Sequence, residues 1–139
     1  MITLVIYLNV LIFVLLSALH FYWAFGGKWA LACSVPELTN KKPLFNPDIF
    51  GTLFIAFGLL IFAFITYFQL DIFSILIGEY IDYATVCIAL IFFIRAIGDF
   101  RYIGLFKKIK GTPFAINDSK IYIPLCLYLS LSSCLIVIL

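Results

Sequence analysis

Four long apolar stretches dominate this sequence and limit what the chain can fold into. They cover residues about 2–25, 48–70, 80–98 and 120–139. A membrane-spanning helix needs roughly 20 mostly apolar residues, and each stretch is close to or above that length. The stretches are continuous rather than alternating, which favours helices over the strands of a membrane barrel. The sequence therefore predicts an all-α protein: a single membrane domain built as a bundle of four spanning helices.

Composition supports lipid rather than water as the solvent. The chain has 139 residues, of which 65% are hydrophobic and 12% charged, whereas a soluble domain is about 45–50% apolar and about 25% charged. A chain this short cannot bury so much apolar surface in a water-soluble core. The first stretch has no Lys or Arg before it and is longer than the apolar part of a signal peptide, so we expect it to be retained as a span.

The basic residues predict how the chain is oriented. All nine Lys and Arg residues fall in or beside the loops at about 26–47 and 99–119, and the loop at about 71–79 has none. Cytoplasmic loops carry the excess of Lys and Arg in membrane proteins. We therefore expect both basic loops to be cytoplasmic and both termini to face the other side. The small net charge of +2 gives no reason to expect a nucleic-acid partner.

The basic loop that begins FRYIGLFKKIK has apolar residues on one arc of a helical wheel and basic residues on the other. This pattern predicts a short amphipathic helix on the inner leaflet, attracted to anionic lipid. An ordinary connecting loop is the alternative. In either case the expected membrane-surface lysines are Lys28, Lys107, Lys108 and Lys110.

Ionisable residues inside two predicted spans indicate a polar cluster. The only histidine, His20, lies roughly 27 Å along the first helix, near the expected cytoplasmic boundary. Arg95 and Asp99 are four residues apart at the corresponding end of the third helix, which would place them on one helical face. Charged groups at such depth tend to pair and to mark function. We therefore expect His20, Arg95 and Asp99 to form one cluster, with Trp23 and Arg101 beside it.

A second interpretation of these residues is purely structural. Arg95 would extend its charged end to the lipid headgroups, with Asp99 as its neutralising partner and His20 as an interfacial hydrogen-bond donor. The chain lacks the sequence signatures of common hydrolases, metalloproteases and nucleotide-binding proteins. No Cys and His spacing supports a metal site, and the sequence indicates no cofactor. The four cysteines are expected to be free packing residues, although their spacing leaves disulfides open.

Several segments together resemble a known family. They are HFYWAFGGKWA from residue 20, PLFNP from residue 43, RAIGDFRYIGLFKK from residue 95, and TPFAINDSKIYIPLCL from residue 112. In this order they are similar to the motifs of DUF3995, a family of small bacterial four-span membrane proteins defined only as a domain of unknown function. The chain departs from the family pattern at Ala30 and Ile123. The resemblance implies that motif residues gather at the cytoplasmic helix ends, with Cys126 on the same side as His20 and Asp99.

Three classes of function follow from these features. The first is a binding or accessory protein that holds an amphiphile or lipid headgroup in the polar cluster, or docks a membrane partner or a second copy. The second is a membrane enzyme acting on a lipid-like substrate, with His20, Asp99 or Cys126 as acid, base or nucleophile. The third is a subunit of a transporter or larger complex. The sequence favours the first class, because ionisable groups for catalysis and polar residues for a continuous pore are both scarce.

Overall fold

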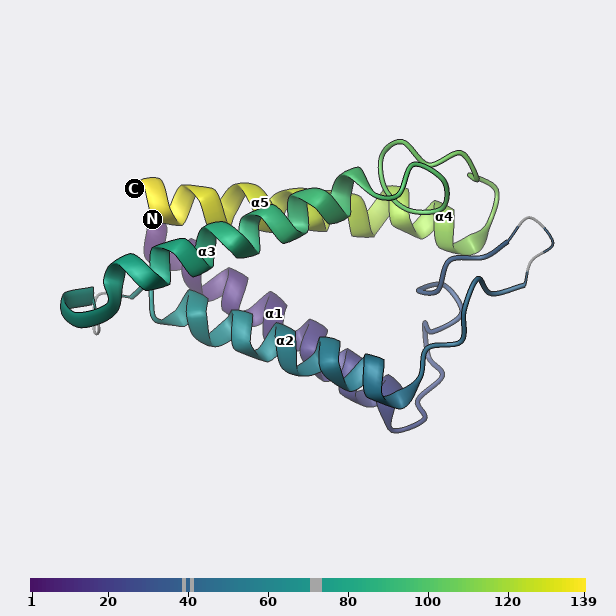
Figure 1. The fold of residues 1–139 in the computed structure, drawn as a ribbon, viewed down its shortest axis with the longest axis horizontal. Coiled ribbons are helices and arrows are strands. Elements are labelled where there is room, and N and C mark those ends of the chain that lie inside the picture. The colour runs from purple at the N-terminus through teal and green to yellow at the C-terminus, as the bar shows by residue number, and fades with distance from the viewer. Residues whose placement is uncertain (39, 41, 71–73) are drawn as a thin grey trace.

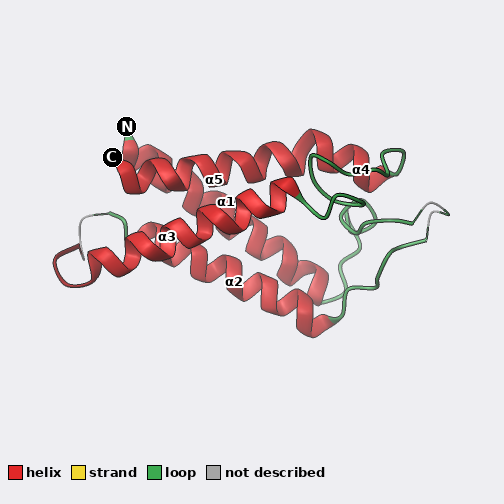
Figure 2. Ribbon diagram, turned by 45° about the horizontal axis from the view of Figure 1, so that its top comes forward, coloured by secondary structure: helices red, strands yellow, loops and turns green. Residues whose placement is uncertain are grey.

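A computed structural model describes residues 1–38, 40, 42–70 and 74–139. Its elements are α1 (Ile2–Ala24), α2 (Ile49–Tyr67), α3 (Ser74–Ile97), α4 (Pro113–Asn117), the π-helical turn η1 (Asp118–Tyr122) and α5 (Ile123–Ile138). The last three form one continuous helical segment. Helices make up the regular structure of the described residues (Figure 2), apart from an isolated bridge between Glu37 and Pro43. Lys41 and Asp71, which belong to the loops of the orientation argument, lie outside these residues.

Two helical hairpins form the bundle. α1 packs mainly against α2, and α3 packs mainly against α5. Both termini lie at one end of the bundle (Figure 1), and the long connections 25–48 and 98–112 lie at the other end. The hairpins are closest near the termini and diverge toward these connections. Four helical segments are long and apolar enough to span a membrane, so the predicted all-α, four-helix membrane bundle is confirmed.

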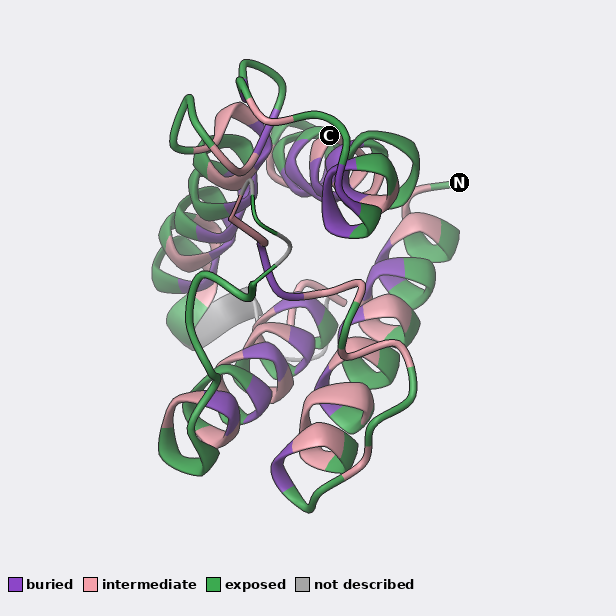
Figure 3. Ribbon diagram, turned by 90° about the vertical axis from the view of Figure 1, so that its right-hand side faces the viewer, coloured by how far each residue is buried: buried purple, intermediate pink, exposed green. Residues whose placement is uncertain are grey.

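The distribution of side chains on α2 is the reverse of that in a soluble helix. Its buried residues include the small Thr52, Ala56 and Ala63, while Phe50 and Phe54 are 84% and 81% exposed. Attraction between helices in lipid depends on close packing rather than on the hydrophobic effect, so small residues favour the interface and bulky apolar residues face lipid. The alternation of buried and exposed stripes is visible along each helix in Figure 3. The protein is therefore a multi-pass membrane protein.

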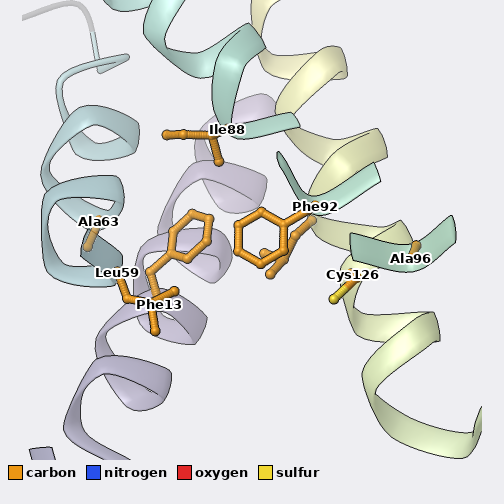
Figure 4. Packing of buried hydrophobic residues seen from close by; sticks show 8 residues of the cluster. Phe13, Leu59, Ala63, Ile88, Phe92, Ala96 and Cys126 are labelled. Atoms are coloured by element: carbon orange, nitrogen blue, oxygen red, sulfur yellow. The ribbon is translucent and has the colours of Figure 1, made fainter. Parts of the chain in front are cut away.

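An aromatic contact joins the two hairpins in the middle of the bundle. The Phe13 ring of α1 lies 5.6 Å from the Phe92 ring of α3 and 6.0 Å from the Phe62 ring of α2, measured between centroids. Figure 4 shows Phe13 and Phe92 facing each other, with Leu59 nearby and Cys126 beside them on α5. Phe13 is fully buried. This contact is the main apolar link between the hairpins.

Hydrogen bonds between helices add to this packing. Asn9 of α1 donates from Nδ2 to Ser132 Oγ of α5 at 2.8 Å, and Ser17 of α1 donates to the Ala56 carbonyl of α2 at 2.7 Å. All four residues are buried. Interhelical hydrogen bonds of this kind contribute about 0.6–2 kcal/mol each in membrane proteins. Asn9 and Ser132 therefore tie the first helix to the last.

Two helix starts differ from the sequence predictions. The segment Asn46-Pro47-Asp48 predicts that Asn46 caps this helix. α2 begins instead one residue after Asp48, whose side chain caps it by accepting a hydrogen bond from Gly51 N. The last helical segment begins at Pro113 instead of about residue 120. Thr112 caps it by accepting from Ala115 N, and Pro113 occupies the first turn. The sequence predicts Asp118 or Ser119 as the cap, because they stand just before the last apolar stretch, and that prediction is wrong because the helix starts earlier.

Replacing Phe13 by alanine tests the aromatic link. We expect Phe13→Ala to lower the free energy of unfolding by about 3–5 kcal/mol, because a cavity opens where three helices meet. Reversible unfolding in mixed detergent micelles measures this loss. The matched control is Phe54→Ala, which removes the same side chain from the lipid-facing surface. Equal losses for the two variants would contradict the assignment.

Candidate functional site

A buried carboxylate organises the end of the bundle that holds the long connections. Asp118 is 0% exposed and lies in η1. Its Oδ1 accepts from Arg95 Nη2 of α3 at 3.1 Å. Its Oδ2 accepts from Lys107 Nζ at 3.1 Å and from the backbone N–H of Gly104 at 2.9 Å. The residues that contact Asp118 therefore come from α3 and from the loop that follows it.

The lysine of this cluster is fully satisfied. Lys107 is 4% exposed. Its Nζ donates to the Gly104 carbonyl at 3.2 Å, to Asp118 Oδ2 at 3.1 Å and to Ser119 Oγ at 2.7 Å. An ammonium group has three donors, and all three have acceptors. Lys107 was expected at the membrane surface, and that prediction was wrong because the loop folds its side chain inward onto Asp118. Lys28, Lys108 and Lys110 are exposed as expected.

The arginine of the cluster is not satisfied. Arg95 Nη1 is buried and has no hydrogen-bond partner in the described residues, although Nη2 of the same guanidinium contacts Asp118. About a third of the Arg95 side chain remains exposed, against none of Asp118. Two cations share one carboxylate, so the Arg95–Lys107–Asp118 cluster has a net charge of +1. A buried donor without an acceptor is costly, and a bound anion would satisfy both the donor and the charge.

The expected pairing of Arg95 with Asp99 was wrong, for a local reason. α3 ends at Ile97, and Gly98 adopts a φ of +80°, so the chain leaves the helix before Asp99. The Asp99 carboxylate turns to its own loop, where Oδ1 accepts from the backbone N–H groups of Arg101, Tyr102 and Ile103 at 2.7–3.0 Å. Residues four apart share a face only while the helix continues. Asp99 therefore shapes the loop and does not belong to the cluster.

Two glycines let this loop pack against the end of α3. A Cβ added to Gly98 would overlap the Ile103 carbonyl, and one added to Gly104 would overlap the Ile97 carbonyl. Gly104 also has a positive φ of +93°. Leu105 N donates to the Ala96 carbonyl at 2.9 Å, which fastens the returning chain. The loop that brings Gly104 and Lys107 to Asp118 is therefore a compact turn, and the predicted amphipathic helix over 101–110 is absent.

His20 and Trp23 form a separate structure at the end of α1. His20 Nδ1 lies 2.8 Å from the Leu16 carbonyl, and since a carbonyl only accepts, Nδ1 carries the proton. The His20 ring lies edge-on to the Trp23 ring. Trp23 Nε1 donates to the Trp29 carbonyl at 2.8 Å and holds the turn that contains Gly26, where φ is +95°. These contacts give His20 and Trp23 a role in the turn after α1, and none joins them to Arg95 or Asp99.

Cys126 and Arg101 also lie apart from the central cluster. Cys126 is 7% exposed and belongs to the hydrophobic core together with Phe13 and Phe92, which suits packing rather than a nucleophile that a substrate must reach. Arg101 is exposed, and its guanidinium lies 5.2 Å from the centre of the Tyr102 ring. All four cysteines are free. In the described residues no group of His, Cys, Asp and Glu side chains has the arrangement of a metal site.

A tyrosine of the same turn fastens the other long connection. Tyr122, at the end of η1, donates from its hydroxyl to the Cys33 carbonyl at 3.1 Å, and its oxygen lies 3.1 Å from Ser34 Oγ. Val35 and Pro36 are buried next in the chain, where the segment 25–48 crosses the end of the bundle (Figure 3). The turn η1 thus positions Asp118 toward α3 and Tyr122 toward the first connection.

Sequence reasoning missed Asp118 and Lys107 as partners. In the sequence Asp118 has the position of a helix cap, and Lys107 is one of the four lysines expected at the membrane surface. One signal was available: Asp118 is one of four acids in or beside the two basic loops. The depth of Arg95 was recognised, but its partner lies 23 residues away, beyond the range of helical spacing.

Removing the central carboxylate tests its structural weight. We expect Asp118→Asn to lower the free energy of unfolding by about 3–5 kcal/mol, since Lys107 then remains buried without a counter-charge. Adding Lys107→Met should restore part of this loss, because it removes the uncompensated ammonium. Unfolding in mixed micelles at neutral pH gives both values. An unchanged free energy of unfolding in Asp118→Asn would show that the ion pairs do not stabilise the fold.

The acid dependence of stability tests the role of Asp99. Slight desolvation acts to raise the pKa of this carboxyl, but the N–H donors of residues 103, 101 and 102 together outweigh it and lower the pKa from its ordinary value of 3.8. A lowered folded-state pKa stabilises the fold above the unfolded-state pKa, and that contribution is lost as the pH falls through the folded-state pKa. We expect Asp99→Asn to be less stable than the original chain at pH 6, with the difference disappearing below 3.8 in thermal unfolding. A difference independent of pH would contradict this assignment.

Comparison with known proteins places these features in a family. No curated protein and no solved structure matched the chain. A family model described as "Protein of unknown function (DUF3995)" matches residues 13–133, which include the whole Arg95–Lys107–Asp118 cluster and the turn after α1. The match covers most of the chain and agrees with the resemblance carried by the sequence motifs. The chain belongs to the DUF3995 family.

Proposed function

We propose that this protein binds an anionic amphiphile, with the anionic headgroup on Arg95 at the end of the bundle that holds the long connections. The observation that carries the proposal is the buried Arg95 Nη1, which has no acceptor in the described residues. Asp118 and Lys107 are already saturated by their mutual contacts. Arg95 is therefore the one member of the cluster whose donors remain open to a ligand.

Charge and access support an anion at this position. The cluster has one more positive than negative charge, and a buried net charge favours a counter-ion. About a third of the Arg95 side chain is exposed, so the side chain borders the outside of the bundle, and a turn of its guanidinium would bring the buried Nη1 to a headgroup. Arg95 lies near the end of α3, at the depth where phosphate or carboxylate headgroups lie above an acyl chain. Guanidinium suits both anions, because its planar N–H groups match paired oxygens.

The orientation of the chain bears on which leaflet supplies the ligand. We propose that the connections 25–48 and 98–112 face the cytoplasm of a bacterial inner membrane, in keeping with the position of every Lys and Arg in the sequence. Exposed Lys28, Lys108 and Lys110 then lie beside the inner leaflet, where anionic lipids concentrate. These lysines would raise the local concentration of anionic amphiphiles, and Arg95 would hold one of them.

Thermal unfolding with defined amphiphiles tests the proposal. Lysophosphatidic acid supplies a single-chain phosphate monoester, and lysophosphatidylcholine supplies the same chain under a zwitterionic headgroup. We expect the detergent-purified protein to be stabilised by the first and not by the second, because only the first presents an uncompensated anion to Arg95. Mass action then raises the melting temperature with ligand concentration.

Two arginine variants complete the experiment. Arg95→Gln should lose the stabilisation by lysophosphatidic acid, whereas Arg101→Gln, which removes an exposed arginine from the same loop region, should keep it. Native mass spectrometry should show the bound amphiphile in the original chain and in Arg101→Gln only. Equal stabilisation by both amphiphiles, or unchanged binding in Arg95→Gln, would refute an anion site at Arg95.

A further inference from the structure

The end of the bundle that holds the two termini has its own polar cluster. There, among the described residues, the groups without a partner are hydrogen-bond acceptors, whereas at Arg95 the group without a partner is a donor. Gln69, just after α2, donates from Nε2 to Asp82 Oδ1 of α3 at 3.0 Å and to Thr85 Oγ1 of α3 at 2.8 Å. Asp82 and Thr85 lie inside a candidate membrane span, Ile77–Ile97. A carboxylate within a span is costly and marks a functional position by default. The Gln69–Asp82–Thr85 cluster is independent of the anion site at Arg95.

The hydrogen donors of this cluster are already used. Both hydrogens of the Gln69 amide nitrogen are engaged, and Thr85 Oγ1 donates to the Ile81 carbonyl at 2.8 Å. The amide orientation follows from chemistry, because a carboxylate only accepts and must face the NH₂ group. Among the described residues, no partner reaches the other carboxylate oxygen of Asp82 or the amide oxygen of Gln69. The open positions are therefore oxygen acceptors.

A buried hydroxyl lies three residues before Gln69 in the chain. Thr66 is 0% exposed, and its Oγ1 has no hydrogen-bond partner in the described part of the chain. Gln69 N donates to the Thr66 carbonyl at 3.3 Å, which makes residues 66–69 a tight turn. Side chains three residues apart eclipse each other in such a turn. The Thr66 hydroxyl therefore lies on the same face as Gln69, one turn deeper in the bundle.

We infer that Asp82, Gln69 and Thr66 form a binding site for a small monovalent cation, with sodium as the fitting ion. Carboxylate, amide and hydroxyl oxygens are the ligands that hard cations prefer. A single carboxylate balances one positive charge, whereas divalent calcium requires more ligands and usually more carboxylates. Among the described residues, the Lys and Arg side chains belong to the connections at the far end of the bundle or to the helix ends beside them, so none of these side chains competes for Asp82. The cation would join the end of α2 to α3, two helices from different hairpins.

Thermal unfolding in sodium, potassium and choline chlorides of equal ionic strength tests this site. We expect sodium to raise the melting temperature of the detergent-purified protein in a saturable manner, and choline to have no such effect, because choline carries the charge without fitting among three oxygens. Identical melting temperatures in all three salts would overturn the inference. Equal stabilisation by potassium would overturn the assignment of sodium.

Three variants separate a cation site from a general salt effect. Asp82→Asn should abolish the sodium dependence. Thr66→Val keeps the side-chain shape and removes one neutral oxygen, so it should weaken the apparent sodium affinity about tenfold while circular dichroism shows an intact fold. Glu79→Gln removes an exposed carboxylate one turn earlier on α3 and should leave the sodium response unchanged. An unchanged response in Asp82→Asn, or a response lost equally in Glu79→Gln, would refute the site.

Discussion

The buried carboxylate of Asp118 is the interaction on which one whole end of this protein depends. Without Asp118, the charges of Arg95 and Lys107 would lie unbalanced at the edge of a hydrocarbon layer. With it, α3, the loop after α3 and the last helical segment are joined through one side chain. Asp118 thus does at this end what the Phe13–Phe92 contact does in the middle of the bundle: it holds together elements that are distant in sequence. Removing either cation would leave the carboxylate with the other cation and the Gly104 N–H group as its partners.

The two ends of the bundle have opposite hydrogen-bonding character. At the Arg95 end the acceptors of Asp118 are filled and a guanidinium N–H group remains open. At the Asp82 end the donors of Gln69 and Thr85 are filled and oxygens remain open. The Arg95 end therefore offers a hydrogen-bond donor and the Asp82 end offers acceptors. Under the two proposals above, an anion would complete the first end and a cation the second.

The sequence was sufficient for the architecture because membrane solvent imposes strong local rules. An uninterrupted apolar stretch of adequate length must be a helix in lipid, so the four spans followed directly from the sequence. The partner of Arg95 did not, because the choice lay between Asp99, four residues away, and Asp118, much farther along the chain. The helix ends at Gly98, which has a positive φ. Because the helix ends there, Asp99 no longer lies on the same helical face as Arg95. Lys107 was misplaced for a similar reason, since nothing in FKKIK distinguishes the one lysine that turns inward.

The π-helical turn at Asp118–Tyr122 sets the rotational phase of the last span. An α-helix advances by about 100° per residue, and a π turn accommodates one residue more than an α turn. The inward-facing stripe of α5 includes Cys126, Leu129 and Ser133. The extra residue of the π turn therefore rotates this stripe about the helix axis, relative to Asp118, by about 100°. Straightening the turn by deleting one residue would keep α5 in place and rotate Asp118 away from Arg95. The number of residues in this short segment, and not only their identity, thus determines whether α5 can pack in the core while Asp118 contacts Arg95.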